Sequence, residues 1–202
     1  MLRKTAGAFA LALLVAACGA ENRTGQPETD TTATTGQSVQ ETTTASATTT
    51  GDSGGTLSAL SPEDKEFITK AGMGGLYEVQ AGNLALQNAT SADVKTFAQR
   101  MVTDHGKANA ELAQLATTKG VALPAELAGD HKAALDHLSS LSGAEFDKMY
   151  MQHMVEDHNK DVAEFDKAST SSTDADLKAW AGKTLPTLKE HQAMAKQIAS
   201  KT

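Results

Sequence analysis

The chain has 202 residues, a formal net charge of −7 and one cysteine. Its 18 Lys and Arg against 25 Asp and Glu argue against a nucleic-acid-binding protein, because phosphate contacts need clustered basic side chains. A single cysteine excludes an intrachain disulfide framework and any Cys-x-x-Cys metal or redox site. No segment approaches the roughly 20 apolar residues of a membrane-spanning helix, which excludes a polytopic membrane protein.

The first residues have the pattern of an export signal. Arg3 and Lys4 form a short cationic start, and the apolar run at 6–17 is long enough for a signal peptide but too short to span a membrane. The run ends in the sequence VAAC, which resembles a bacterial lipobox, where signal peptidase cleaves before the cysteine and the thiol is acylated. We therefore predict a signal peptide at 1–17 and lipidation of Cys18, the alternative being an ordinary signal peptide with a chance cysteine.

The next segment, 18–56, is predicted to be a disordered tether. It is dominated by Thr and Ser and cannot bury enough apolar surface to offset its conformational entropy. Gly19 follows the cysteine, and by resemblance to the sorting rule of Gram-negative lipoproteins the absence of Asp there favours the outer membrane, facing the periplasm. The rest of the chain, 57–202, holds all 6 histidines and is long enough for one hydrophobic core.

Four long helices are predicted in 57–202. Ser61 before Pro62 is typical of a helix start, and Ser142 with Glu145 fits a capping box. The helices are predicted to begin at Ser61-Pro62, Thr90–Asp93, Ser142–Glu145 and Thr173–Asp176, and to end near Asn88, Lys119-Gly120, Ala168 and the C-terminus.

The connection from Thr118 to Leu141 is longer than a hairpin turn, and its sequence AELAGDHKAALDHLSSL predicts a short extra helix. No segment alternates with the period of a strand, so no sheet is expected. A bundle with one long crossover between its second and third helices has ferritin-like topology. The predicted fold is therefore an all-α, ferritin-like four-helix bundle.

Each long helix carries one titratable residue near the middle of its apolar seam: Glu78, His105, His158 and His191. At 1.5 Å of rise per residue, the crossover topology places all four in the middle part of the bundle. Buried charges without partners cost several kcal/mol, so these groups must satisfy one another, bind an ion or line a wet cavity. Three interpretations of these four residues are possible: a metal site, a polar network without metal, or seams that are wrongly assigned.

For a metal site, one carboxylate and three imidazoles suit Zn, Fe or Cu rather than Ca or Mg. The sequences around His105 and His158 form a repeat, and both copies have Asp directly before His and Met four residues before it. Asp104 and Asp157 are then candidates for orienting the imidazole rings. Met101 and Met154 point to copper if their sulfurs take part, whereas the alternative is that they fill gaps in the core.

Other site types are disfavoured. Di-iron carboxylate bundles use Glu-x-x-His pairs, and no histidine here has Glu three residues before it. The sequence shows no nucleophile with an adjacent base and no phosphate-binding loop, so an enzyme is the least expected class. His131 and His137 fall in the crossover and His153 faces away from His158, so all three are predicted to be exposed.

Several ordered motifs together resemble the bacterial exported family called domain of unknown function 4142. They are FITKAGMGGLYEV at 67–79, FAQRMVTDH at 97–105, GAEFD at 143–147 with Tyr150 and His158, and Thr184-Leu185-Pro186 followed by His191. The resemblance covers about residues 60–199. It implies a ferritin-like bundle, with signal peptides frequent and lipid anchors present in some members, and it implies no established reaction.

These features predict a lipid-anchored envelope protein whose bundle binds a transition metal through Glu78, His105, His158 and His191, for storage, buffering, sensing or stress protection. The alternative is a non-catalytic interaction module of the envelope, in which the same cluster only fixes the packing. The expected partner is the membrane, through the lipid anchor. No nucleic acid is expected, and the sequence does not indicate a protein partner.

Overall fold

A computed structural model describes residues 60–202, which form helices and no strand. The predicted signal peptide, lipidation site and tether at 1–56 lie outside the described residues. The helices are α1 (Pro62–Asn88), α2 (Ala92–Thr118), α3 (Gly129–Ser139), α4 (Gly143–Ser171) and α5 (Ala175–Ala199). The predicted all-α class is confirmed, and α3 is the predicted short extra helix.

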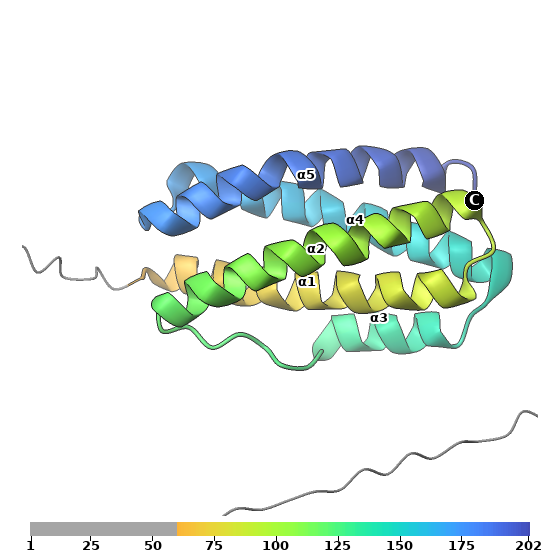
Figure 1. The fold of residues 1–202 in the computed structure, drawn as a ribbon, viewed down its shortest axis with the longest axis horizontal. Helices are drawn as coiled ribbons and strands as arrows, with labels where there is room; N and C mark the ends of the chain where they lie inside the picture. The colour runs from red at the N-terminus through yellow and green to blue at the C-terminus, as the bar shows by residue number, and fades with distance from the viewer. Residues whose placement is uncertain (1–59) are drawn as a thin grey trace, which may run out of the picture. The chain divides into compact units, whose positions relative to one another are not determined.

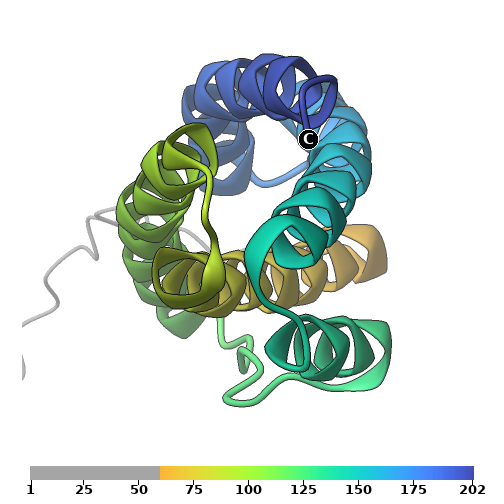
Figure 2. The ribbon, with the colours of Figure 1, turned by 90° about the vertical axis from the view of Figure 1, so that its right-hand side faces the viewer.

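The four long helices form a ring in which α1 packs on α2 and α4, and α5 packs on the same two helices (Figure 2). Helices α1 and α5 run in one direction, and α2 and α4 run in the other (Figure 1). Helix α3 belongs to the crossover between α2 and α4, and it lies outside the ring against α1 and α4. This is the predicted ferritin-like arrangement with one long crossover.

Side-chain caps are present at the starts of three of the five helices, α1, α2 and α5. Ser61, Ser91 and Asp174 each accept a hydrogen bond from the backbone N–H three residues later. The predicted capping box at Ser142 does not form, because its side chain makes no capping hydrogen bond. The first turn of α4 is instead anchored by the buried carboxylate of Asp147, which accepts hydrogen bonds from the α1–α2 connection.

The apolar core divides into two clusters along the bundle. One contains Phe97 and Tyr150, and the other contains Phe165 and Trp180. On every helix of the ring, the predicted seam Glu or His falls between residues of the two clusters. The fold therefore places one polar layer between two apolar ones.

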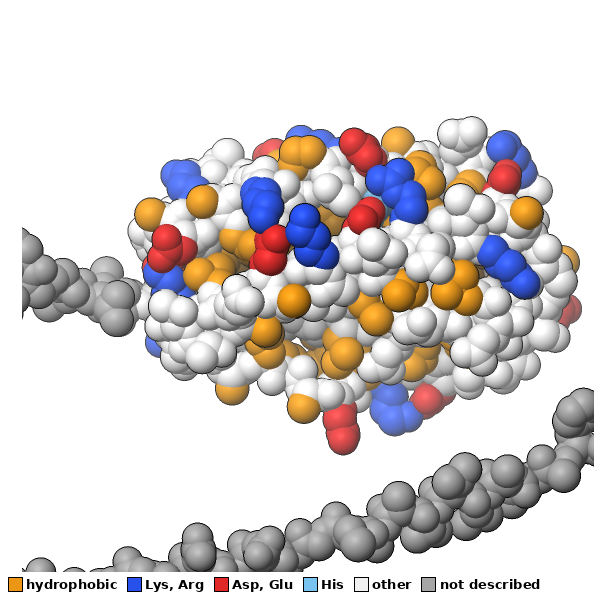
Figure 3. Space-filling model, viewed as in Figure 1, with side chains coloured by type: hydrophobic (Ala, Val, Ile, Leu, Met, Phe, Trp, Pro, Cys, Tyr) orange, Lys and Arg blue, Asp and Glu red, His pale blue; other side chains and the backbone are white. Residues whose placement is uncertain are grey.

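The face of the bundle drawn in Figure 3 carries both apolar and charged side chains. Basic and acidic side chains are interspersed on this face without a patch of one sign (Figure 3). None of the described helices is both long and apolar enough to cross a membrane.

Candidate metal centre

The polar layer takes one side chain from each helix of the ring. Glu78 comes from α1, His105 from α2, His158 from α4 and His191 from α5, and none is more than 6% exposed. The structure therefore brings together the four residues that the sequence singles out, in the interior of the bundle.

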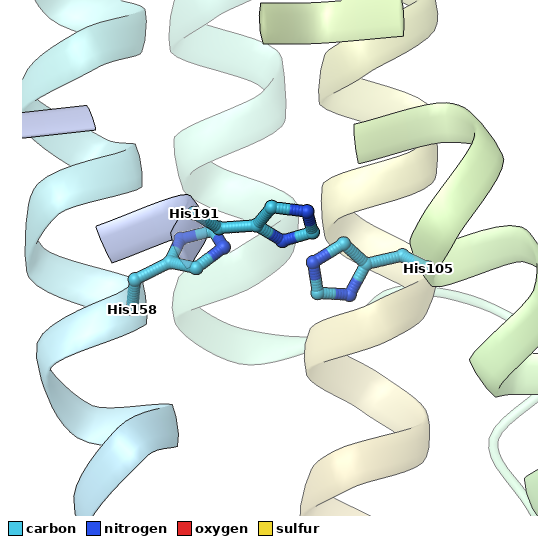
Figure 4. Close-up of side chains that lie close together, drawn as sticks. All are labelled: His105, His158 and His191. Carbon is cyan, nitrogen blue, oxygen red and sulfur yellow. The ribbon is translucent and has the colours of Figure 1, made fainter. Parts of the chain in front are cut away.

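The three imidazoles converge on one point (Figure 4). Their ring centroids are 5.6 Å apart for His105 and His158, 5.4 Å for His158 and His191, and 5.3 Å for His105 and His191. Each ring offers one ligand atom, and these atoms lie within 4.8 Å of one another. Within 60–202 this is the one group of three or more His, Cys, Asp or Glu side chains with such a geometry.

The second nitrogen of each ring is held by an acceptor. Glu78 Oε2 lies 2.7 Å from His105 Nδ1, the carbonyl of Met154 lies 2.8 Å from His158 Nδ1, and Asp104 Oδ2 lies 2.8 Å from His191 Nε2. Because these oxygens only accept hydrogen bonds, the ring proton sits on the held nitrogen. A lone pair is left on His105 Nε2, His158 Nε2 and His191 Nδ1, and these three buried atoms have no hydrogen-bond partner.

Burial keeps two of these rings neutral. It lowers the pKa of His158, and it lowers the pKa of His191 to about 4, against the opposing hydrogen bond to Asp104. A neutral imidazole is the form that ligates a metal. At neutral pH both rings therefore present a lone pair to the centre of the bundle.

Glu78 lies beside the group of three imidazoles. Burial alone would raise the pKa of its carboxyl, but the neighbouring histidines, His105 first, outweigh burial and hold this pKa below its ordinary value. Its Oε1 lies 3.5 Å from His158 Nε2 and has no hydrogen-bond partner. Glu78 thus orients His105 with one oxygen, and the Asp161 carboxyl, with its raised pKa, lies within hydrogen-bonding reach of the Glu78 carboxylate. The role of Glu78 as a direct metal ligand stays a prediction.

The other predicted site residues take different places. Asp104 contacts His191 of α5, not the adjacent His105, and it also lies 3.5 Å from Arg100. Met101 and Met154 are fully buried in an apolar cluster, and Met154 contacts His158 through its backbone carbonyl.

Asp157 forms no ion pair with the three clustered imidazoles. Its nearest ion-pair partner is Lys160, with Nζ 4.0 Å from Oδ1. The side chain is 20% exposed. Its predicted role in orienting a ring stays a prediction, because no hydrogen bond joins it to one.

The prediction that all three remaining histidines are exposed holds only for His137. His153 and His131 are half-buried, because α3 covers this side of α1 and α4. Nδ1 of His153 lies 2.8 Å from the hydroxyl of Tyr77, and the ring of His131 lies 5.2 Å from the Tyr77 ring.

Sequence reasoning also missed Asp161, one helical turn after His158. Burial and the charge of Glu78 raise the pKa of Asp161 well above its ordinary value. Asp161 follows His158 by three residues, a spacing that places both side chains on one face of α4. This spacing in the sequence could have identified Asp161 as a residue near the site.

We expect Asp104→Ala to weaken metal binding by about 10- to 100-fold, because His191 loses the acceptor that fixes its ring and proton. The measurement is a competition titration against a chromophoric chelator. Glu190→Ala is the matched control, because Glu190 binds the same Arg100, at 3.1 Å, without touching the cluster. Equal affinities for the two variants would contradict the role given to Asp104.

We expect Asp157→Asn to stabilise the metal-free protein at pH 8 by about 1–3 kcal/mol. Burial, followed by the charge of Glu78, raises the pKa of Asp157 from 3.8 to about 7. Between these values the folded state binds the proton more tightly than the unfolded state, so the wild type loses stability as the pH rises through this window. The gain from the substitution should therefore grow between pH 4 and pH 7 and then level off.

Urea unfolding in the presence of a chelator measures this gain. Asp166→Asn, at an exposed position of the same helix, controls for the loss of one negative charge. A gain from Asp157→Asn that is the same at every pH would show that the folded state does not hold this proton.

Solved structures support the fold. A DUF305 fragment from Deinococcus radiodurans has a TM-score of 0.62 and 11% identity, and the match covers 71% of this chain and 99% of that chain. CopM in the Cu(II)-bound form has a TM-score of 0.59 and 17% identity, covering 68% and 96%. CopM in the Ag-bound form has a TM-score of 0.54 and 18% identity, covering 66% and 93%. At these identities the likeness shows the fold alone.

Sequence comparison places the chain in a family. No curated protein matches the chain significantly. Residues 30–198 match the model of a family described as a domain of unknown function, DUF4142, a match that begins earlier than the motifs quoted above. Since this match covers most of the sequence, the chain is a member of the DUF4142 family.

Proposed function

We propose that the bundle binds one transition-metal ion between His105, His158 and His191, and that the protein stores or buffers this metal. The observation that carries the proposal is the set of three unpartnered ring nitrogens in a buried group. A buried polar atom without a partner costs about 1–3 kcal/mol. Three such atoms directed at one point are accounted for by an ion that they share.

The donor set limits the choice of ion. Imidazole suits Zn, Cu and Fe, and no thiolate is present among residues 60–202. The similar CopM structures contain Cu(II), Cu(I) or Ag, which supports copper as the first ion to test here.

A second candidate is a polar network that fixes the packing of a non-catalytic envelope module. The bond of 2.7 Å between Glu78 and His105 favours it, since each satisfies the other without an ion. A polar network accounts for the three ring nitrogens that have a hydrogen-bond acceptor. It does not account for the three buried ring nitrogens that have no partner. Metal binding therefore explains more of the cluster.

The proposal includes attachment to the outer membrane, facing the periplasm, through a lipid on Cys18. The support is the sequence alone: the apolar run at 6–17, the VAAC motif and the Thr- and Ser-rich segment that follows. Mass spectrometry of the mature N-terminus should find an acylated cysteine, and Cys18→Ser should move the protein out of the membrane fraction. An unmodified Cys18 in membrane-free extract would overturn the anchor and leave the metal proposal intact.

The test of metal binding uses the purified protein. Elemental analysis gives the metal content, and competition titrations with Cu⁺, Cu²⁺ and Zn²⁺ give the affinities. We expect one tightly bound ion per chain, released on acidification as the imidazoles become protonated. If none of these ions binds at one equivalent, and none shifts the unfolding midpoint, the proposal fails.

A further inference from the structure

An open cavity of about 320 Å³ lies between α1, α3 and α4 and reaches the polar layer. Helix α3 forms its outer wall with His131, while Tyr77 and Glu78 of α1 form its inner wall. The Tyr77–His153 hydrogen bond joins α1 to α4 in its lining. The crossover helix thus creates a partly enclosed space on one side of the bundle.

The charge of this cavity is negative. Two basic side chains, Lys70 and Lys160, line it, and Lys70 is paired with Glu66 at 2.8 Å. A concave surface of one sign attracts ions of the other sign and raises their local concentration. Against the two lysines stand the carboxylates of Glu78, Asp130, Glu156 and Glu164, and the carboxyl groups of Asp157 and Asp161, whose pKa values are raised, add two further oxygen ligands.

The deepest of these carboxylates points to a ligand. The Glu78 side chain is 2% exposed, and its Oε1 has no hydrogen-bond partner. The same oxygen is 3.5 Å from His158 Nε2, one of the three free imidazole nitrogens. An ion that enters this cavity and reaches Glu78 is therefore next to the imidazole group.

A second, inner cavity continues beyond Glu78. Its volume of about 20 Å³ suffices for one small ion or water, and its lining includes His105 and Trp180. Glu78 and Asp161 line both the outer and the inner cavity. These two carboxylates thus stand between the solvent side and the interior of the bundle.

We infer that the outer cavity is the entrance through which a hydrated cation, rather than an anionic metal complex, reaches the three imidazoles. This inference rests on the proposed metal binding. The carboxylates at the mouth draw the cation in, and the carboxylate of Glu78 receives it as it loses water. His158 then takes it up from Glu78. The crossover helix serves the site by shaping this entrance.

Gly74→Leu tests the entrance by filling it. Gly74 lines the cavity, and a Cβ there would lie 4.0 Å from Asp161 Oδ1, so a side chain fits and extends into the open space. Gly106→Leu is the matched control, because this glycine of α2 has nothing within 4 Å of its would-be Cβ. Both substitutions change helix propensity in the same way.

Cu²⁺ uptake by the full chain can be followed in a stopped-flow instrument through the fluorescence of Trp180, the only tryptophan. We expect Gly74→Leu to slow uptake roughly tenfold or more, with one ion still bound at the end, and Gly106→Leu to match the wild type. If Gly74→Leu takes up Cu²⁺ at the wild-type rate, the inferred entry route is wrong, while the proposed metal site is unaffected. A wild type that binds no ion would overturn both.

If Gly74→Leu does not fold, the double variant Asp130→Asn, Glu156→Gln tests the same inference through charge. Both side chains are exposed in the wall of the cavity. The double variant should take up Cu²⁺ several-fold more slowly than the wild type at low ionic strength, and the two rates should converge at high salt. Equal rates at low salt would overturn the entrance.

Discussion

His158→Leu should abolish stabilisation of the protein by metal while leaving the metal-free protein at least as stable as the wild type. The wild-type ring is fully buried, and its Nε2 has no hydrogen-bond partner. Leucine has a similar volume and removes this unsatisfied atom without leaving a cavity. At an ion concentration a hundredfold above Kd, the wild type should gain about 2.7 kcal/mol, and the variant should gain almost nothing.

Chemical unfolding of both proteins, once with a chelator and once with Cu²⁺ or Zn²⁺, measures the difference. His137→Leu is the matched control, because His137 is exposed on α3, outside the imidazole group. The account would be wrong if His158→Leu kept the full gain from metal. A large loss of stability in the chelator, with no metal effect in the wild type, would instead favour the packing network.

Phe97→Ala should cost about 3–5 kcal/mol of unfolding free energy. The Phe97 ring is fully buried. Its centroid lies 6.2 Å from that of His158, 6.4 Å from His191 and 6.3 Å from Tyr150. Truncation leaves a cavity between the polar layer and the core, and the two imidazoles lose the ring that packs against them.

Urea unfolding in a chelator measures this loss, and Phe97→Leu, which keeps most of the volume, should cost about 1.5 kcal/mol or less. Metal affinity should fall with Phe97→Ala as well, because two ligand rings are no longer held in place. A loss below about 1 kcal/mol for Phe97→Ala would mean that the ring does not support the cluster.

Local signals in the sequence account for most of the fold. The Ser61-Pro62 start and the end of α1 at Asn88 were predicted as observed. Helix α4 runs to Ser171, past the predicted end near Ala168, and the backbone N–H of Ser172 closes its last turn on the Ala168 carbonyl. The hydroxyls of Thr170 and Ser171 add side-chain hydrogen bonds to carbonyls of the preceding turn.

The polar layer could be predicted because the apolar spacing of each helix identifies its inward face. The partners within the layer could not, since they depend on how the helices are rotated against one another. Asp104 shows this, because it lies beside His105 in the sequence yet binds His191 of α5. The half-buried positions of His131 and His153 likewise follow from the packing of α3, which no local pattern specifies.

The most direct test of the proposed centre is X-ray absorption spectroscopy on the protein loaded with one equivalent of Zn²⁺. The account predicts imidazole scattering from three ligands at about 2.0–2.1 Å, and its loss in His158→Leu. A spectrum that shows oxygen ligands alone, unchanged by that substitution, would contradict it.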